Sequence, residues 1–173
     1  EFPYAYYGQL AIQELDDEAP QYVFPNEPAT IDADSLTTFE SRSLVSAMHV
    51  LAEVGEELHF DRFARTLDDQ IKSEGEVQAY YDLVIGERKT YLAVRPGKVA
   101  RNNGYEVPQV IYPPYRVPDR AARYVEEPLI LGLSRQESEF NPRAFSRARA
   151  RGLMQLLSST AQITARKEGI PYN

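Results

Sequence analysis

The stretch LGLSRQESEFNPRAFSRARARGLMQLLSSTAQ, residues 131–162, decides the fold of this part of the chain and raises the question of its function. It opens on an apolar helical pattern that carries one carboxylate, Glu137, close to its end. A loop with arginines at alternate positions follows, and a second apolar run comes after it. Glu137 is therefore either an ordinary surface glutamate beside a basic patch or half of an active site.

The first half of the stretch belongs to a predicted helix. Pro128 suits a first helical turn, and the acidic pair Glu126 and Glu127 favours the positive end of a helix. Asn141-Pro142 breaks the helix directly after Phe140, because a residue before proline disfavours the helical conformation.

Glu137 shares the apolar face of that helix. It lies four residues after Leu133 and seven after Ile130, and residues at these spacings project from the same side. Partial burial at such a place favours the neutral carboxylic acid, which is the form that a general acid needs near neutral pH. The pattern alone therefore makes Glu137 a candidate catalytic residue.

The second apolar run predicts another helix, from Gly152 to about Lys167. Its apolar positions are Leu153, Leu156, Leu157 and Ala161. Glu137 would then end one helix and face the loop that begins the next, with the polar residues Ser146 and Gln155 close by. A helix–loop–helix with an acid at its junction predicts the corner of a cleft.

The same residues carry a resemblance to a known family. The sequence RQESEFNPRAFS, followed by GLMQLLSSTA, resembles the first catalytic motif of the soluble lytic transglycosylases, whose catalytic domain has a goose-lysozyme-like fold. The identities run without a gap, at Glu137, Ser138, Phe140, Asn141, Pro142, Ala144, Ser146, Ala148, Ala150, Gly152–Leu156, Thr160 and Ala161. Upstream, a helical array and a YYGQLA-like helix look like the superhelical region that precedes this domain.

The resemblance implies a reaction on peptidoglycan. Glu137 would protonate the glycosidic oxygen between N-acetylmuramic acid and N-acetylglucosamine. It would then deprotonate the muramyl 6-hydroxyl, which closes a 1,6-anhydro ring without water. Most glycosidases need two carboxylates, but here the substrate's own N-acetyl group would stabilise the oxocarbenium-like centre.

The resemblance also implies supporting roles. Ser146 would hydrogen-bond the N-acetyl region, Gln155 and Met154 would line the sugar cleft, and Leu157 would replace a methionine that floors a subsite. Gly152 would let backbone and substrate approach closely. The structural residues of the motif are Ser138, Phe140, Asn141, Pro142 and Gly152.

No metal or organic cofactor is implied. The implied setting is a periplasmic monomer that binds peptidoglycan glycan strands, with other cell-wall enzymes as candidate partners.

The chain departs from the family pattern in three respects. Arg149 replaces the loop glycine, which predicts an altered or strained turn. Leu157-Ser158 replaces a Met-Pro pair. Only 59 residues follow Pro114 (173 − 114), whereas a domain of this kind needs roughly 150 residues, and the later A-Y-N-A-G-type motif is absent. We therefore expect a fragment of a larger transglycosylase, truncated at both ends, which could be inactive by itself.

The rest of the sequence predicts an all-α fold. Between about Ser41 and Gly104, four short amphipathic helices with tight turns are typical of stacked helical hairpins, an α-solenoid or a bundle. Their apolar faces are Leu44, Val45, Met48, Leu51 and Ala52; Phe60, Phe63, Ala64 and Leu67; Val77, Tyr80, Tyr81, Val84 and Ile85; and Tyr91, Leu92, Val94 and Val99. We expect a helical superhelix over residues 1–106, an extended proline-rich connector over 107–118, and the start of a lysozyme-like domain over 119–173.

Composition and charge narrow the possible functions. Of the 173 residues, 43% are hydrophobic and 26% are charged, and no apolar run approaches the roughly 20 residues that span a bilayer. The absence of cysteine excludes disulfides and thiolate metal sites, and His49 and His59 lack the spacing of a metal site. Residues 1–114 hold 9 basic and 20 acidic residues, a net charge of −11, against 10 and 6, or +4, in 115–173. The acidic majority makes nucleic acid a poor ligand for the whole chain.

Three other interpretations remain open. A hydrolytic relative would leave a reducing muramic acid end. A non-catalytic helical scaffold would carry the transglycosylase motif as a vestige. A polyanion site would use the arginines of the loop, although these lack interleaved aromatic residues beyond Phe145. Those arginines are Arg143, Arg147, Arg149 and Arg151.

Overall fold

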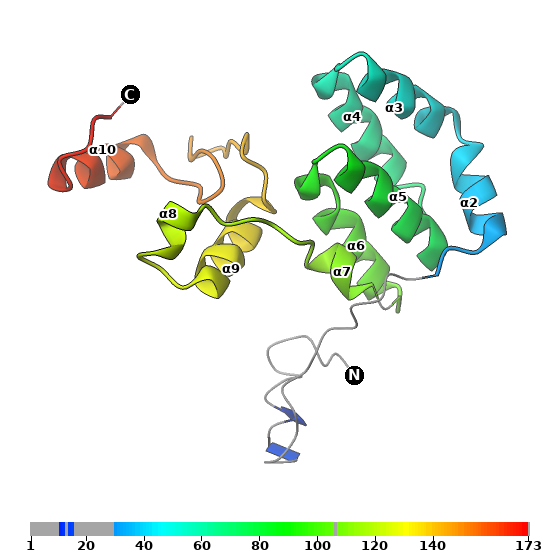
Figure 1. Ribbon diagram of the computed structural model, residues 1–173, viewed down its shortest axis with the longest axis horizontal. Coiled ribbons are helices and arrows are strands. Elements are labelled where there is room, and N and C mark those ends of the chain that lie inside the picture. Colours follow the sequence, from blue (N-terminus) through cyan, green and yellow to red (C-terminus); the bar gives the residue numbers. More distant parts are fainter. Residues whose placement is uncertain (1–10, 13, 16–29, 106, 173) are drawn as a thin grey trace. The chain divides into compact units, whose positions relative to one another are not determined.

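The computed structural model describes residues 11–12, 14–15, 30–105 and 107–172, which form helices joined by turns and loops (Figure 1). Within these ranges, extended pairing is limited to two isolated bridges, which join Arg151 to Phe145 and to Leu156. The expected all-α fold is therefore confirmed. The YYGQLA-like helix expected near the N-terminus falls mostly outside the described residues.

The chain divides into two compact units. Unit 1 contains the described residues before Lys89 together with Leu92–Pro113. Unit 2 contains Lys89–Tyr91 together with the chain from Pro114 onward. The division at Pro113 falls inside the proline-rich stretch that was expected to connect two domains.

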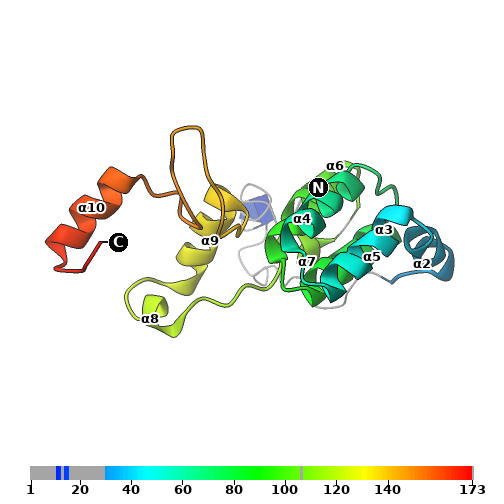
Figure 2. The same ribbon diagram turned by 90° about the horizontal axis from the view of Figure 1, so that it is seen from above.

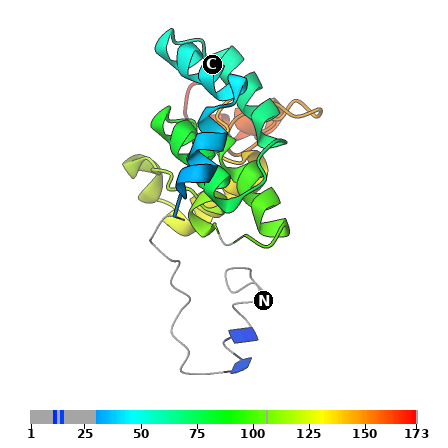
Figure 3. The ribbon, with the colours of Figure 1, turned by 90° about the vertical axis from the view of Figure 1, so that its right-hand side faces the viewer.

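Unit 1 is an array of short helices (Figures 1 and 3). They are α2 (Ala33–Glu40), α3 (Ser43–Glu53), α4 (Glu57–Asp68), α5 (Glu74–Gly86), α6 (Val94–Asn102) and α7 (Pro108–Ile111). The 3-10 turn η1 (Thr90–Leu92) precedes α6, and its first two residues belong to unit 2. Helix α3 packs against α4, α2 against α5, and α6 against α7. The buried core includes Phe39, Val45, Met48, Phe60, Leu67, Val77, Tyr80, Val84, Val94, Val110 and Ile111. The four helices expected from the apolar spacing correspond to α3, α4, α5 and α6.

The apolar face of α6 differs from the expected one. Val99, expected in the core, is 42% exposed. The helix instead buries Gly97, where an added Cβ would come within 2.9 Å of the backbone of Val110 and Ile111 in α7. Because α7 occupies that side of α6, Val99 two positions later points away from it.

Two short helices of unit 1 were not expected. Helix α2 begins after Asp32, whose side chain accepts a hydrogen bond from the backbone N–H of Ser35 at 2.7 Å, an N-cap that an Asp-x-x-Ser pattern can signal. The expected extended connector contains the single turn α7, so that expectation is wrong there. Pro108 suits its first position, and Val110 and Ile111 are fully buried against the array.

Unit 2 consists of α8 (Asp119–Ala122), α9 (Glu127–Ser138), α10 (Ser158–Lys167) and the loop between α9 and α10, which extends as a narrow excursion beside α9 (Figure 2). Helix α9 confirms the prediction of a helix with Pro128 in its first turn. It ends two residues before the expected boundary, because Glu139 and Phe140 adopt left-handed φ values of 53° and 64°.

The predicted start of the last helix is wrong. Helix α10 begins at Ser158 rather than at Gly152. Gly152 and Gln155 have φ values of 74° and 46°, which an α-helix cannot contain. The helical spacing of Leu153 and Leu156 therefore arises in a loop. No helix among the described residues is both long and apolar enough to cross a membrane.

Candidate functional site

Glu137 is the penultimate residue of α9, and its side chain is exposed. Its carboxylate makes no hydrogen bond or ion pair within the described part of the chain. The apolar neighbours on its face are only partly covered, since Leu133 is 41% exposed and Ile130 is half-buried. The expected partial burial of Glu137 is therefore wrong for the described residues, because they leave Glu137 and Leu133 exposed on this face of α9.

The turn that follows Glu137 is held in an uncommon conformation. Glu139 and Phe140 are both left-handed, at a cost for residues that carry a Cβ. Their backbone N–H groups donate back to the carbonyl oxygens of Arg135 and Ser134, at 3.1 and 3.3 Å. The Phe140 ring is buried and stacks on Tyr115, with centroids 4.8 Å apart. This packing fixes the direction in which the chain leaves the end of α9.

Ser138, beside Glu137, joins α9 to the far end of the loop. Its hydroxyl lies 2.8 Å from the carbonyl oxygen of Leu153 and 3.0 Å from that of Ser134, and it donates to these oxygens. The buried Ser134 in turn donates its hydroxyl proton to the Met154 sulfur at 3.3 Å. The helix that carries Glu137 and the segment 153–154 therefore form one hydrogen-bonded assembly.

Gln155 closes the loop through its side chain. Its amide nitrogen donates to the carbonyl oxygens of Ala144, at 3.2 Å, and Gly152, at 2.9 Å. The backbone N–H of Gly152 also donates to the carbonyl oxygen of Ala144 at 3.0 Å. The amide nitrogen expected to line a sugar cleft is thus engaged within the loop. Gly152 itself is needed for its φ of 74° rather than for space, because an added Cβ would meet nothing closer than 3.8 Å.

Ser146 closes a smaller turn at the tip of the loop. Its hydroxyl oxygen accepts the backbone N–H of Ala150 at 3.0 Å, which leaves its proton able to donate elsewhere. Arg149, which replaces the family's glycine in this turn, has a φ of 65°. The strain expected from this replacement is therefore present in the structure.

The structure brings some of the predicted site residues together and leaves others apart. Ser138 and Met154 share the assembly at the end of α9, and Gln155 holds the loop that joins it. Leu157 precedes α10 and is 41% exposed, and Met154 is 37% exposed, so both can offer apolar surface to a ligand. Among the described residues, no hydrogen bond links Glu137 to Ser146.

The sequence did not predict one residue that contacts the loop after α9. Tyr91 belongs to unit 2, is 8% exposed, and accepts a hydrogen bond from the Arg143 guanidinium at 2.8 Å. The two residues are 52 positions apart, and no local pattern indicates such a pairing.

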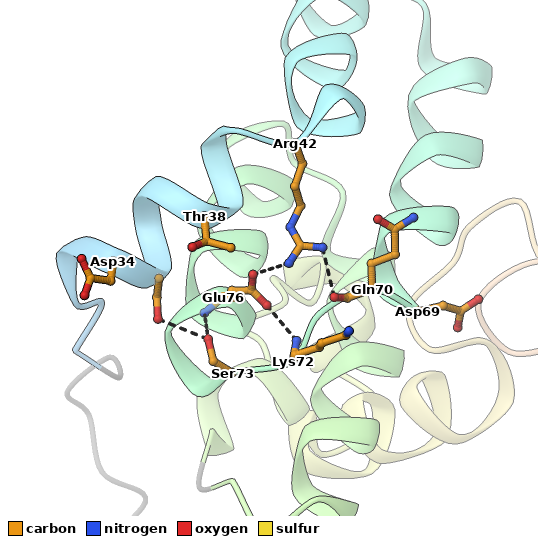
Figure 4. Close-up of a pocket in the computed structure, with 9 residues that line it drawn as sticks. Asp34, Thr38, Arg42, Asp69, Gln70, Lys72, Ser73 and Glu76 are labelled. Atoms are coloured by element: carbon orange, nitrogen blue, oxygen red, sulfur yellow. Dashed lines mark hydrogen bonds and ion pairs between the residues drawn. The ribbon is translucent and has the colours of Figure 1, made fainter.

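A polar pocket of about 730 Å³ in unit 1 is a second candidate site (Figure 4). Glu76, 3% exposed, pairs there with the Arg42 guanidinium, and its other carboxylate oxygen accepts the Lys72 backbone N–H at 2.8 Å. Arg42 also donates to the Gln70 carbonyl oxygen at 3.0 Å. The charges of Arg42 and Glu76 compensate each other, so we interpret the cluster as a clamp that joins the start of α3 to α5 and to the loop before α5.

The histidines and acidic residues of the described ranges give no metal site, since no three of them gather where they could hold an ion. His49 and His59 lie on the surface, beside Glu40 and Glu56.

The assembly at the end of α9 lies in a segment that is found in other proteins. Residues 119–173 match the family described as Transglycosylase SLT domain. This SLT segment contains Glu137 and the whole loop that Ser138 and Gln155 tie to α9. A putative soluble lytic murein transglycosylase of Haemophilus influenzae is 50% identical over 48 residues, which cover 28% of this chain and 8% of that protein.

Two solved structures are similar over almost the whole chain. The lytic transglycosylase Slt of Pseudomonas aeruginosa, solved as an inactive mutant, matches 96% of this chain with a TM-score of 0.79 and 26% identity. The 70-kDa soluble lytic transglycosylase, solved in complex with bulgecin A, matches 97% with a TM-score of 0.71 and 19% identity, a likeness of fold. The chain spans 27% and 26% of these two proteins. It therefore resembles soluble lytic transglycosylases both upstream of the SLT segment and within it.

Proposed function

We propose that the protein containing this chain is a peptidoglycan lytic transglycosylase. It would cleave the β-1,4 bond between N-acetylmuramic acid and N-acetylglucosamine and form a 1,6-anhydro-muramic acid end. The observation that carries this proposal is the position of Glu137. It is the penultimate residue of a helix inside the SLT segment, is open to a ligand, and is followed by Ser138, which anchors the helix end to the loop.

Glu137 would act as the single general acid and base. As the neutral acid it donates its proton to the glycosidic oxygen, which leaves as the free hydroxyl of N-acetylglucosamine. As the carboxylate it then takes the proton of the muramyl 6-hydroxyl while that oxygen bonds to the anomeric carbon, so the acid is regenerated. The substrate's N-acetyl group would stabilise the positive charge between the two steps, which removes the need for a second carboxylate. The inactive form of the Pseudomonas aeruginosa relative carries a single glutamate-to-glutamine replacement, which agrees with dependence on one acid.

The other motif residues would bind or shape the sugar site. Ser146 keeps a hydroxyl proton for the N-acetyl region, and the exposed faces of Met154 and Leu157 would contact sugar rings. Gln155 holds the loop through its amide nitrogen, so we assign it to the shape of the cleft. We also propose that the protein binds the glycan strands of peptidoglycan, is located in the periplasm and is a monomer. Unit 1 would be part of the helical superhelix that precedes the catalytic domain.

Replacement of Glu137 by glutamine tests the proposal. In the full natural protein, purified sacculi should yield anhydro-muropeptides, detected by mass spectrometry, and Glu137→Gln should lower their release by about 10²–10⁴-fold. Glu127→Gln, at the first turn of the same helix, is the matched control and should retain activity. Unchanged turnover by Glu137→Gln would refute the acid assignment. Reducing muramic acid ends released by the natural protein would favour a hydrolytic enzyme. No product at all would favour the non-catalytic helical scaffold.

A further inference from the structure

A short segment that lies between α5 and α6 in the sequence belongs to unit 2. Lys89–Tyr91 follows α5 in the chain, yet its contacts place it with the residues from Pro114 onward. Lys89 and Tyr91 are each only 8% exposed. The segment precedes residues 119–173, which carry the family match, so the SLT segment is completed by residues from outside that match.

The contact between Tyr91 and Arg143 is directional. The Arg143 guanidinium donates to the Tyr91 hydroxyl oxygen at 2.8 Å, and its central carbon lies 5.9 Å from the centre of the Tyr91 ring. Tyr91 is buried, so its ring holds a long cation at one place on the surface of unit 2. A hydrogen bond from a charged donor is stronger than one between neutral groups, which makes the hydroxyl the specific part of this contact.

Hydrogen bonds lead from Arg143 to the end of α9. The Arg143 backbone N–H donates to the side-chain oxygen of Asn141 at 2.9 Å. The Asn141 backbone N–H donates in turn to the Ser138 carbonyl oxygen at 3.0 Å, next to Glu137. The Arg143 side chain therefore anchors the outer end of the turn that sets the direction of α9's last residues.

We propose that Tyr91 is a positioning residue for Glu137, acting through Arg143 and Asn141. This inference rests on the proposed function, since it concerns the geometry of the same acid. The Tyr91 hydroxyl fixes Arg143, and Arg143 fixes the turn after α9. Glu137 is exposed among the described residues, so the turn is the element seen to restrain it. Small displacements of a catalytic group lower the rate of the chemical step more than they weaken the binding of substrate.

The test uses Tyr91→Phe in the full natural protein, because phenylalanine keeps the buried ring and removes only the hydroxyl. With soluble uncrosslinked glycan strands as substrate, kcat should fall by about three- to tenfold, because the hydroxyl acts on Glu137 only through Arg143 and the turn, while KM changes less than twofold. Tyr105→Phe is the matched control. Its hydroxyl also makes a 2.8 Å hydrogen bond, to the Lys72 carbonyl oxygen in unit 1, and kcat should not change.

A double-mutant cycle with Arg143→Gln separates positioning from general loss of stability. The two replacements should be non-additive in kcat, because either one removes the same contact. Additive effects on kcat, or a Tyr91→Phe variant with wild-type kcat, would overturn the inference. A lower melting temperature with unchanged kcat would likewise mean that the contact is only structural. These outcomes require a natural protein that releases anhydro-muropeptides; absence of that product would refute the proposed function, and the positioning role with it.

Discussion

The hydroxyl of Ser138 and the carbonyl oxygen of Leu153 lie 2.8 Å apart, which links the residue after Glu137 to a position 15 residues further along the chain. The loop between them contains the strained Arg149, and Gln155, two residues beyond Leu153, closes this loop through the carbonyl oxygens of Ala144 and Gly152. The position of the candidate acid therefore depends on the whole loop as well as on the helix that carries it.

Ser138→Ala should weaken this link. Loss of the hydroxyl leaves the partly buried Leu153 carbonyl oxygen without that donor, and we expect the free energy of unfolding to fall by about 1 kcal/mol. Urea denaturation followed by circular dichroism measures the change. Ser159→Ala, at an exposed position in α10, serves as the control and should have little effect. Equal losses in both variants would contradict a special role for the hydroxyl.

Arg149→Gly should stabilise the protein. Glycine adopts a φ of 65° without steric cost, and we expect a gain of about 0.5–1 kcal/mol after allowing for the greater freedom of glycine in the unfolded chain. The same measurement on Arg147→Gly provides the control, because Arg147 is not among the residues of this loop with positive φ. A gain in the control, or a loss at position 149, would show that backbone strain is not the reason.

Arg42→Met should destabilise unit 1 strongly. The change leaves the buried Glu76 carboxylate without its cationic partner, and we expect a loss of about 3 kcal/mol in the free energy of unfolding. Replacing both Arg42 and Glu76 by apolar residues should recover part of this loss. Arg116→Met tests an exposed pair, with Asp119 at 3.8 Å, and should hardly change stability. Similar effects at the two arginines would contradict the clamp.

Tyr80 should make the protein sensitive to alkaline pH. Burial raises the pKa of the Tyr80 hydroxyl above its usual range. Its contribution to stability is therefore complete below the unfolded pKa of about 10 and is lost as the pH rises above it. The difference in melting temperature between the natural protein and Tyr80→Phe should shrink from pH 8 to 11. Tyr124→Phe, at a position 82% exposed, is the surface control, and its effect on the melting temperature should be small.

Local signals predicted the helices whose ends are marked by their own residues. Pro128 and the acidic pair before it placed the start of α9, and the burial of Val45, Phe60 and Tyr80 follows the expected spacing of the helices in unit 1. These features depend on neighbours within about four positions in the chain, which a sequence pattern records directly.

Features that depend on distant partners were not predictable in this way. Leu153 and Leu156 have helical spacing, but Gln155 bonds to Ala144, 11 residues earlier, and keeps that segment in a loop. The exposure of Val99 follows from the packing of α7 on Gly97. The sequence correctly placed Glu137 near the end of a helix. Its exposure depends on which distant residues cover α9, and the spacing of apolar residues does not reveal those partners.

The discontinuous make-up of unit 2 also bears on the order in which a nascent chain folds. Tyr91 leaves the ribosome 52 residues before Arg143, an interval of about 3–10 s at ordinary rates of protein synthesis. Helices α3, α4 and α5 are complete by then, so they can fold while Arg143 is still being made. Tyr91 would then be synthesised well before the residues of the SLT segment with which it completes unit 2.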